Sequence, residues 1–238
     1  MLLADWREEF LAVCTESTSE LALFSSLQSI AEDLGFKSCS YGIRLPLPIS
    51  APSFHLRSSY PKAWEESYIS NNYFFLDPTV RHALSTHLPL AWAAQDSVQD
   101  GPFWEEARMH GLSHGWCQST AGRFGDIGQL SMVRSHGIIS AKELAHQEHK
   151  LMWLTSLVHS TMRNFLLPER LPESQAGLTD REKEVLRWTA SGKTYSEIGD
   201  ILTIDARTVK FHIVNTLKKL NAANKAEAAV KATILGML

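Results

Sequence analysis

The last 61 residues of the chain constrain its fold most, because their start and stop signals divide them into short helices. Thr179 followed by Glu182 has the Ser/Thr-x-x-Glu form of a capping box, which predicts a helix start, and Gly192 predicts its end. Asp205 is a good N-cap, because its carboxylate can accept hydrogen bonds from the free amides of the next turn. The four predicted helices cover residues 179–192, 195–202, 205–220 and 222–236.

The third predicted helix has two different faces. Val209, Ile213, Leu217 and Leu220 recur at intervals of four, four and three, which forms one stripe that can be buried. The opposite side carries cations and hydrogen-bonding groups, namely Arg207, Thr208, Lys210, Phe211, His212, Val214, Asn215 and Lys218. Such a face suits the major groove of DNA, and the preceding helix and short turn complete a helix-turn-helix. The alternative is a plain four-helix subdomain with a solvated polar face.

Charge supports a nucleic-acid partner for this segment alone. Residues 178–238 hold ten Lys/Arg and seven Asp/Glu, a net charge of +3, whereas residues 1–177 hold thirteen and nineteen, a net charge of −6. An excess this small predicts weak binding by one copy, so a dimer that reads two half-sites of double-stranded DNA is the expected form.

The composition is that of a globular chain, and its length allows one large or two ordinary domains. Of the 238 residues, 44% are hydrophobic and 9% are aromatic, but no run of eighteen is apolar. The acidic N-terminus does not resemble a signal peptide, so we expect neither membrane insertion nor export, and a cytoplasmic location. Cys14, Cys39 and Cys117 are predicted to be reduced thiols, and the spacing of the ten histidines offers no zinc site.

The first 165 residues predict an α+β fold. Helical periodicity covers residues 3–14, 19–34, 62–70, 77–85, 102–110 and 140–165. Strand patterns cover residues 37–45, 53–60, 90–92, 114–122 and 126–133. We expect an α-β-α sandwich, in which an antiparallel sheet has helices on both faces and can enclose a small-ligand cavity. Residues 166–177, with two prolines, are predicted to link this domain to the helical domain of residues 178–238.

Both parts resemble the LuxR family of transcriptional regulators. The helical segment matches its DNA-binding domain at Leu178, Thr179, Arg181, Glu182, Val185, Leu186, Gly192, Lys193, Thr194, Glu197, Ile198, Thr208, Val209, Lys210, His212, Leu220 and Lys225. The first part resembles its autoinducer-binding domain through Tyr60, Pro61, Trp64, Tyr68, Asp77, Pro78, Thr79, Val80, Trp92, the run from Phe103 to Ala107, Gly111, Leu112, Gly115, Gly128 and Ser131. Within the family, the segment from Gly192 to Asn215 is most similar to orphan receptors of the QscR type.

The resemblance implies an N-acyl-homoserine lactone as ligand. Trp64 would donate its indole N–H to the lactone carbonyl, Asp77 would accept from the amide N–H, and Tyr60 and Ser131 would hold the amide carbonyl. The implied apolar wall is Tyr68, Val80, Trp92, Phe103 and Cys117, with Ser40 and Arg44 near the acyl chain. Each unmade hydrogen bond in such a site would cost about 1 to 3 kcal/mol. Alternatively, Trp92 and Phe103 are ordinary core residues, and Asp77 is only a helix N-cap.

We therefore expect a quorum-sensing regulator, not an enzyme, which needs no cofactor besides its ligand and binds promoter DNA as a homodimer. A long acyl chain is expected, and RNA polymerase is left open as a further partner. The expected DNA-binding residues are Thr194, Arg207, Thr208, Lys210, Phe211, Val214, Asn215 and Lys218. The alternatives are a phosphorylation-controlled response regulator, a regulator of a non-lactone compound, and a lactone-hydrolysing enzyme. The last lacks a metal cluster or an activated nucleophile in the sequence.

Overall fold

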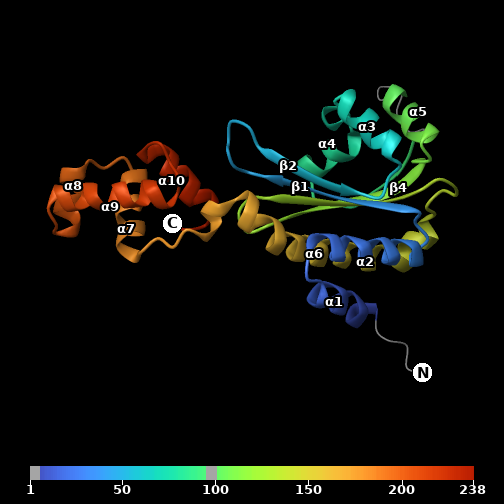
Figure 1. The fold of residues 1–238 in the computed structure, drawn as a ribbon, viewed down its shortest axis with the longest axis horizontal. Coiled ribbons are helices and arrows are strands. Elements are labelled where there is room, and N and C mark those ends of the chain that lie inside the picture. The colour runs from blue at the N-terminus through green and yellow to red at the C-terminus, as the bar shows by residue number, and fades with distance from the viewer. Residues whose placement is uncertain (1–5, 95–100) are drawn as a thin grey trace. The chain divides into compact units, whose positions relative to one another are not determined.

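The computed structural model describes residues 6–94 and 101–238, and the chain divides into two compact units (Figure 1). The first unit comprises the chain up to Arg44 together with residues 54–122 and 126–165, and the second comprises residues 45–53, 123–125 and 166–238. None of the helices in the described part of the chain combines the length and the hydropathy that a bilayer crossing requires.

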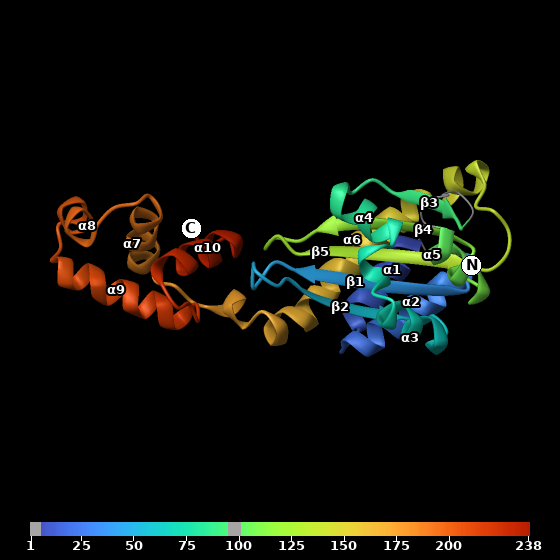
Figure 2. The same ribbon diagram turned by 90° about the horizontal axis from the view of Figure 1, so that it is seen from above.

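The first unit is built on a five-stranded sheet. Its strands are β1 (Ser38–Leu45), β2 (Ser53–Ser58), β3 (Leu90–Ala93), β4 (His114–Ala121) and β5 (Ile127–Arg134), in the order β2-β1-β5-β4-β3 (Figure 2). The β1–β5, β4–β5 and β3–β4 pairs are antiparallel. In the register, Ser131 of β5 lies opposite Ser40 on one side and Cys117 on the other. Since side chains alternate along a strand, these three residues share one face of the sheet.

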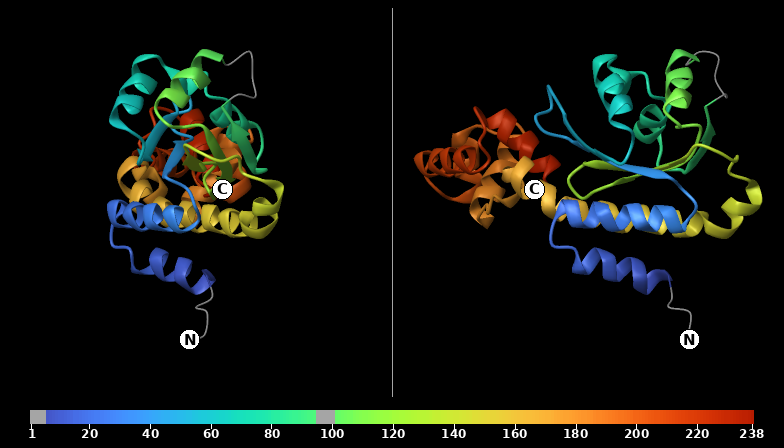
Figure 3. Two further views of the ribbon diagram at one scale, coloured as in Figure 1. Left: turned by 90° about the vertical axis from the view of Figure 1, so that its right-hand side faces the viewer. Right: turned by 45° about the vertical axis from the view of Figure 1, so that its right-hand side comes forward.

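Helices cover both faces of this sheet, which confirms the predicted fold class. On one face lie α3 (Lys62–Ser70), the 3-10 turn η1 (Tyr73–Phe75), α4 (Pro78–Ser85) and α5 (Gly101–Met109). On the other face, α2 (Glu20–Asp33) runs beside α6 (Ala141–Arg170), and α1 (Trp6–Glu16) lies outside them (Figure 3). The ring of Trp6 meets that of Trp153 edge to face, with centroids 5.3 Å apart, so aromatic packing holds α1 against α6.

A buried polar network joins the sheet to α6. The Tyr41 hydroxyl lies 2.8 Å from His159 Nδ1, and the Asp126 carboxylate pairs with Arg163. A Cβ on Gly128 would lie 2.1 Å from His159 Nδ1, so the imidazole can approach β5 only because residue 128 has no side chain. Polar side chains therefore connect this face of the sheet to α6.

The long helix α6 continues past its predicted end at Phe165 to Arg170, so the first five residues of the predicted linker are helical. Pro168 lies inside this last stretch, where it removes a backbone donor. The helix persists because Leu166, Leu167 and Leu171 are buried, and the Leu171 amide still donates to the Leu167 carbonyl over 2.8 Å. A 3-10 turn, η2 (Pro172–Gln175), follows. Residues 1–5, where we predicted part of the first helix, lie outside the described chain.

The second unit holds the four predicted helices, α7 (Asp180–Ala190), α8 (Tyr195–Leu202), α9 (Ala206–Lys219) and α10 (Lys225–Ile234). Thr179 and Glu182 form the predicted capping box at the start of α7. Thr194 and Glu197 form a second capping box at the start of α8, and Asp205 caps α9 by accepting from the Arg207 amide over 2.6 Å. Local hydrogen bonding therefore fixes where each helix of the helix-turn-helix begins.

The turn between α8 and α9 packs against a glycine of α8, Gly199. Thr203 adopts a left-handed conformation with φ of 53°, and the Ile204 amide donates back to the Gly199 carbonyl over 2.9 Å. A Cβ on Gly199 would lie 2.7 Å from the Ile204 carbonyl oxygen, which is closer than real contacts allow. Residue 199 therefore lets α9 approach α8 at the turn.

Replacing Gly199 with Ala should destabilise the α8–α9 pair by about 1 to 3 kcal/mol, because the steric clash outweighs the gain of about 1 kcal/mol in helix propensity. Hydrogen exchange in the full chain measures this, with faster exchange expected across α8 and α9. Gly177→Ala is the matched control, since a Cβ there meets nothing within 4 Å. Unchanged protection in Gly199→Ala would contradict this account of the turn.

Candidate ligand-binding cavity and DNA-binding helix

A cavity of about 370 Å³ lies in the first unit, between the sheet and the helices α3, α4 and α5. Its floor comes from β1, β2 and β5, and its walls from residues of the three helices and of β3. All of the predicted ligand residues except Cys117 line it, namely Ser40, Arg44, Tyr60, Trp64, Tyr68, Asp77, Val80, Trp92, Phe103 and Ser131. Residues distant in sequence therefore meet at one mostly apolar cavity.

Asp77 is both the N-cap of α4 and a wall of this cavity. One carboxylate oxygen accepts from the Thr79 amide and hydroxyl, each over 2.8 Å, and the other accepts from the Tyr68 hydroxyl over 2.9 Å. Burial raises the pKa of Asp77, and the hydrogen bonds from Thr79 and Tyr68 offset only part of that effect. Burial and the neighbouring Asp77 charge also raise the pKa of Tyr68, so this phenol remains a donor.

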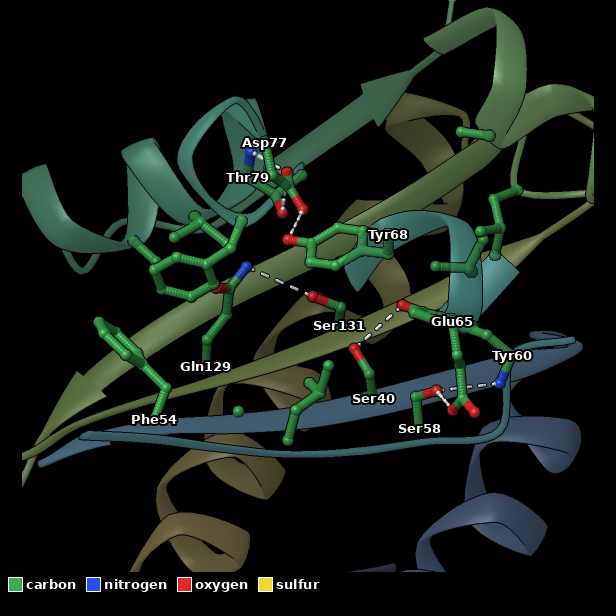
Figure 4. A pocket seen from close by; sticks show the side chains of 18 of the residues that line it. Ser40, Phe54, Ser58, Tyr60, Glu65, Tyr68, Asp77, Thr79, Gln129 and Ser131 are labelled. Atoms are coloured by element: carbon green, nitrogen blue, oxygen red, sulfur yellow. Dashed lines mark hydrogen bonds between the residues drawn. The ribbon is translucent and has the colours of Figure 1, made fainter. Parts of the chain in front are cut away.

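A second polar cluster lies on the floor of the cavity. The Ser40 hydroxyl is 3.0 Å from the Tyr60 hydroxyl, and Ser131 lies opposite Ser40 in the neighbouring strand. The Gln129 amide reaches the Ser131 hydroxyl from two residues along β5, at 3.4 Å (Figure 4). Figure 4 shows Asp77 and Tyr68 above these hydroxyls, so polar atoms face one another across the cavity.

Two tryptophans present indole N–H groups that have no hydrogen-bond partner within the described chain. The Trp64 ring is buried among Tyr68, Tyr73 and Phe103, with centroid distances of 5.7, 5.8 and 5.7 Å. The Trp92 nitrogen is buried as well. A Cβ on Gly115 would lie 2.3 Å from the Trp92 ring, so the indole lies flat on β4 only because residue 115 is glycine. Trp92 and Phe103 thus pack in the aromatic core and line the cavity together.

Cys117 departs from its predicted position in the wall, although its thiol is buried beside Ser131 in the sheet. The end of helix α4 lies on β4, where the Ser119 hydroxyl is 2.9 Å from the carbonyl oxygens of both Ala83 and Thr86 and can donate its one hydrogen to either. β4 is therefore covered by α4, and the cavity lies over β1, β2 and β5. Burial raises the pKa of the Cys117 thiol, which leaves it protonated and unreactive.

Several residues that line the cavity were not among the ligand residues predicted from the sequence. They are Gly42, Ile43, Phe54, His55, Leu56, Ser58, Glu65, Ile69, Phe74, Thr79, Ala83, Leu84, Trp104, Ala107, Leu112, Ile127, Gln129 and Val133. Strand alternation could have found some of them, because Ile127, Gln129 and Val133 lie two or four residues from Ser131 on the same face of β5. The residues from β2 could not be inferred, because nothing in the sequence states which face of that strand meets α3.

In the second unit, α9 divides into a buried and an exposed side as predicted. Val209, Ile213 and Leu220 are buried, but Leu217 is only half-buried, and Thr216 is buried instead with its hydroxyl bonded to the His212 carbonyl. The exposed side carries Arg207, Thr208, Lys210, Phe211, Val214 and Lys218, whereas His212 and Asn215 are half-buried. The Thr194 hydroxyl is occupied by the cap of α8.

The cations on this exposed side of α9 are available to a polyanion. Within the residues that the structure describes, Arg207, Lys210 and Lys218 have no carboxylate within ion-pair distance. By contrast, Lys219 pairs with Glu182 and Lys231 with Glu227. Phe211 is 60% exposed beside them, which is unusual for an aromatic side chain without a contact surface. No group of three or more metal-ligating side chains occurs in the described residues.

Two family models match the chain. The autoinducer binding domain matches residues 19–162, and the luxR family of bacterial regulatory proteins matches residues 176–232. The chain belongs to the luxR family. The protein is therefore a LuxR-type, autoinducer-binding transcriptional regulator of quorum sensing and not an enzyme.

Individual members of the LuxR family are similar over most of the chain. The transcriptional activator AnoR of Acinetobacter nosocomialis is 40% identical over 99% of this chain and 100% of its own. A crystal structure of Escherichia coli SdiA aligns with a TM-score of 0.86 and 30% identity, covering 98% and 97% of the two chains. A structure of SdiA in complex with octanoyl-rac-glycerol aligns with a TM-score of 0.83 and 31% identity, covering 97% of this chain and 94% of its own. The structure of the N-acylhomoserine lactone-dependent factor CepR2 of Burkholderia cenocepacia aligns with a TM-score of 0.63 and 27% identity, covering 67% of this chain and 94% of its own.

Asp77→Asn should leave the ligand-free LuxR-type fold as stable as the wild type, or more stable, at about pH 7.5. Asparagine caps helices well and keeps an oxygen for Thr79, while the cost of a buried charge disappears. Because the folded-state pKa of Asp77 is raised, that cost is present above this pKa and is lost as the pH falls to the unfolded value near 3.9.

Thermal unfolding at about pH 7.5 and about pH 4 measures the difference, which should shrink at the lower pH. Glu66→Gln is the control, since Glu66 is exposed and its replacement removes no buried charge. A large loss of stability in Asp77→Asn at the higher pH would show that the ionised carboxylate stabilises the fold, against this account.

Proposed function

We propose that this regulator binds an N-acyl-homoserine lactone with a long acyl chain in the cavity and, as a cytoplasmic homodimer, binds promoter DNA. The observation that carries the proposal is the division of one cavity into a polar part and an apolar part. The polar part is lined by donors and acceptors of Tyr60, Trp64, Asp77 and Ser131. The other described walls are mainly aliphatic and aromatic, which suits an alkyl tail.

The lactone head group matches the polar part group by group. The Asp77 carboxylate has accepting capacity beyond its three hydrogen bonds, which suits the ligand's amide N–H. The Trp64 indole N–H would donate to the lactone carbonyl, and the hydroxyls of Tyr60 and Ser131 would donate to the amide carbonyl. Ser40 holds Tyr60 in place through their mutual hydrogen bond.

The length of the cavity favours a long acyl chain. Its lining positions on β5 run from Val133 to Ile127, which corresponds to about 20 Å at a rise of about 3.3 Å per residue. At its margin the lining side chains are apolar and exposed, with Phe54, Leu56, Ile69 and Leu84 exposed by 43, 55, 75 and 48%. An apolar opening of this kind can accommodate the end of a chain that is longer than the enclosed space.

The DNA-binding part of the proposal rests on α9. Residues 178–238 would form the DNA-binding domain, residues 1–165 the ligand-binding domain, and residues 166–177 their connection. Arg207, Lys210 and Lys218 would contact phosphates or base edges in the major groove, with Thr194, Thr208, Phe211, Val214 and Asn215 beside them. A homodimer would read two half-sites, RNA polymerase being a further candidate partner at the promoter.

The second candidate ligand class is the monoacylglycerols, because a structure of the similar protein SdiA contains octanoyl-rac-glycerol. A monoacylglycerol has an alkyl tail, an ester carbonyl and hydroxyls but no amide N–H. In the same cavity a glycerol hydroxyl would have to donate to Asp77 instead. Competition between a long-chain acyl-homoserine lactone and a monoacylglycerol of equal chain length decides between them, with tighter binding of the lactone expected.

Trp64→Phe should weaken the response to the lactone about tenfold, because the variant keeps the aromatic packing and loses one hydrogen bond of about 1.4 kcal/mol. A dose-response curve in a promoter-reporter strain measures this. Phe103→Leu serves as a control for altered packing. Because it keeps the Trp64 indole, it should still bind a lactone more tightly than an analogue that lacks the ring carbonyl, whereas Trp64→Phe should lose that difference. Unchanged sensitivity of Trp64→Phe would contradict the assigned pose.

Lys210→Ala should abolish operator binding while ligand binding stays intact, because Lys210 belongs to the exposed side of α9 and the cavity lies wholly in the other unit. Electrophoretic mobility shift and ligand titration on the same preparation measure both. Lys142→Ala removes one exposed cation from α6 and should change neither. Wild-type operator affinity in Lys210→Ala would refute the role given to this face.

A further inference from the structure

We infer that Gln129 recognises an oxygen on the third carbon of the acyl chain, so that the receptor prefers 3-oxo or 3-hydroxy lactones to unsubstituted ones. The inference rests on the proposed function, since it presumes that a lactone occupies the cavity. It names the residue that distinguishes ligands of one chain length.

Gln129 projects into the cavity beyond the polar part. It lies on β5 two residues from Ser131, and its partner in the register of β1 is Gly42. Gly42 has no side chain, so the Gln129 amide has room above the sheet. Even a Cβ built on Gly42 would have Leu56 Cδ1, at 3.6 Å, as its nearest neighbour. Figure 4 shows the amide between Ser131 and Phe54, which lies at the apolar opening.

The amide of Gln129 has hydrogen-bonding capacity that the protein leaves unused. It can offer two donors and accept two hydrogen bonds. Its contact with the Ser131 hydroxyl is 3.4 Å, beyond the usual 2.7 to 3.2 Å for an N–H donor. The Cys117 thiol is also a neighbour, but it is a weak partner. Ser119 lies opposite Gln129 in β4, and its hydroxyl donates to the carbonyl of Ala83 or Thr86. An alkyl tail lying against this amide would exclude water without replacing the lost hydrogen bonds, which is unfavourable.

The spacing of the two side chains fits an oxidised third carbon. In the proposed pose, Ser131 binds the amide carbonyl, which is the first carbon of the acyl chain. One methylene separates that carbonyl from the third carbon, so their oxygens can be bound by two adjacent groups. Gln129 is the polar group adjacent to Ser131 on the way to the apolar opening. Its N–H can donate to a ketone, and its carbonyl can accept from a hydroxyl.

Calorimetric titration of the full chain with three ligands tests the inference. The probes are N-dodecanoyl-, N-(3-oxododecanoyl)- and N-(3-hydroxydodecanoyl)-homoserine lactone. The wild type should bind both oxidised ligands about tenfold more tightly than the unsubstituted one, the factor expected for one hydrogen bond. In Gln129→Met, which has a similar length but no amide, the three affinities should agree within about twofold.

Gln129→Glu gives an independent result, because a carboxylate accepts but does not donate. This variant should bind the 3-hydroxy ligand about as tightly as the wild type does, whereas its affinity for the 3-oxo ligand should fall about tenfold or more. Leu84→Met, an apolar change at the opening, is the control and should shift all three affinities together. Thermal unfolding checks each variant, and if Gln129→Met does not fold, Gln129→Glu carries the test.

The outcomes separate the two proposals. Equal binding of the three ligands by the wild type, or an unchanged preference in Gln129→Met, would overturn the role of Gln129 and leave lactone binding standing. Failure of the wild type to bind any of the three would instead contradict the proposed function, and the inference would fall with it.

Discussion

A carboxylate removed from water persists only where hydrogen bonds replace its hydration, and Asp77 obtains three such bonds. Two of them also begin α4, and the third fixes the ring of Tyr68 from α3. One charged group therefore sets the distance between the two helices that roof the cavity. Because burial raises its pKa, the arrangement costs stability in the empty fold. In the proposed pose, the amide N–H of the ligand would donate to Asp77 and offset part of that cost.

The two faces of the sheet serve different purposes. On the face toward α6, the Tyr41–His159 hydrogen bond and the Asp126–Arg163 ion pair join the sheet region to the helix, and Gly128 lets the His159 ring come close to β5. On the other face, Ser40, Gly42 and Ser131 have small side chains or none, which leaves room for the cavity between the sheet and the helices α3 and α4. A ligand that binds the cavity of the folded chain, and does not bind the unfolded chain, would stabilise the fold by its binding free energy.

Much of this fold was predictable because its signals are local. Caps and periodicity predicted the ends of the four C-terminal helices to within three residues, and alternation predicted the strands. The errors arose where tertiary packing prevailed. Burial of Leu166 and Leu167 carried α6 through Pro168, and the contact of α4 with β4 removed Cys117 from the cavity wall. The resemblance to the LuxR family supplied the polar ligand residues, whereas Gln129 required the strand register and the unused amide to be seen together.

The central claim is that an apolar cavity with a polar end binds an amide-linked lactone, and the temperature dependence of the binding enthalpy tests it most directly. Burial of the alkyl tail should give a negative heat-capacity change, with one ligand bound per chain. Titration of purified wild-type protein with N-(3-oxododecanoyl)-homoserine lactone at several temperatures should show both. Absence of saturable binding at every temperature, or a heat-capacity change of zero, would contradict the account.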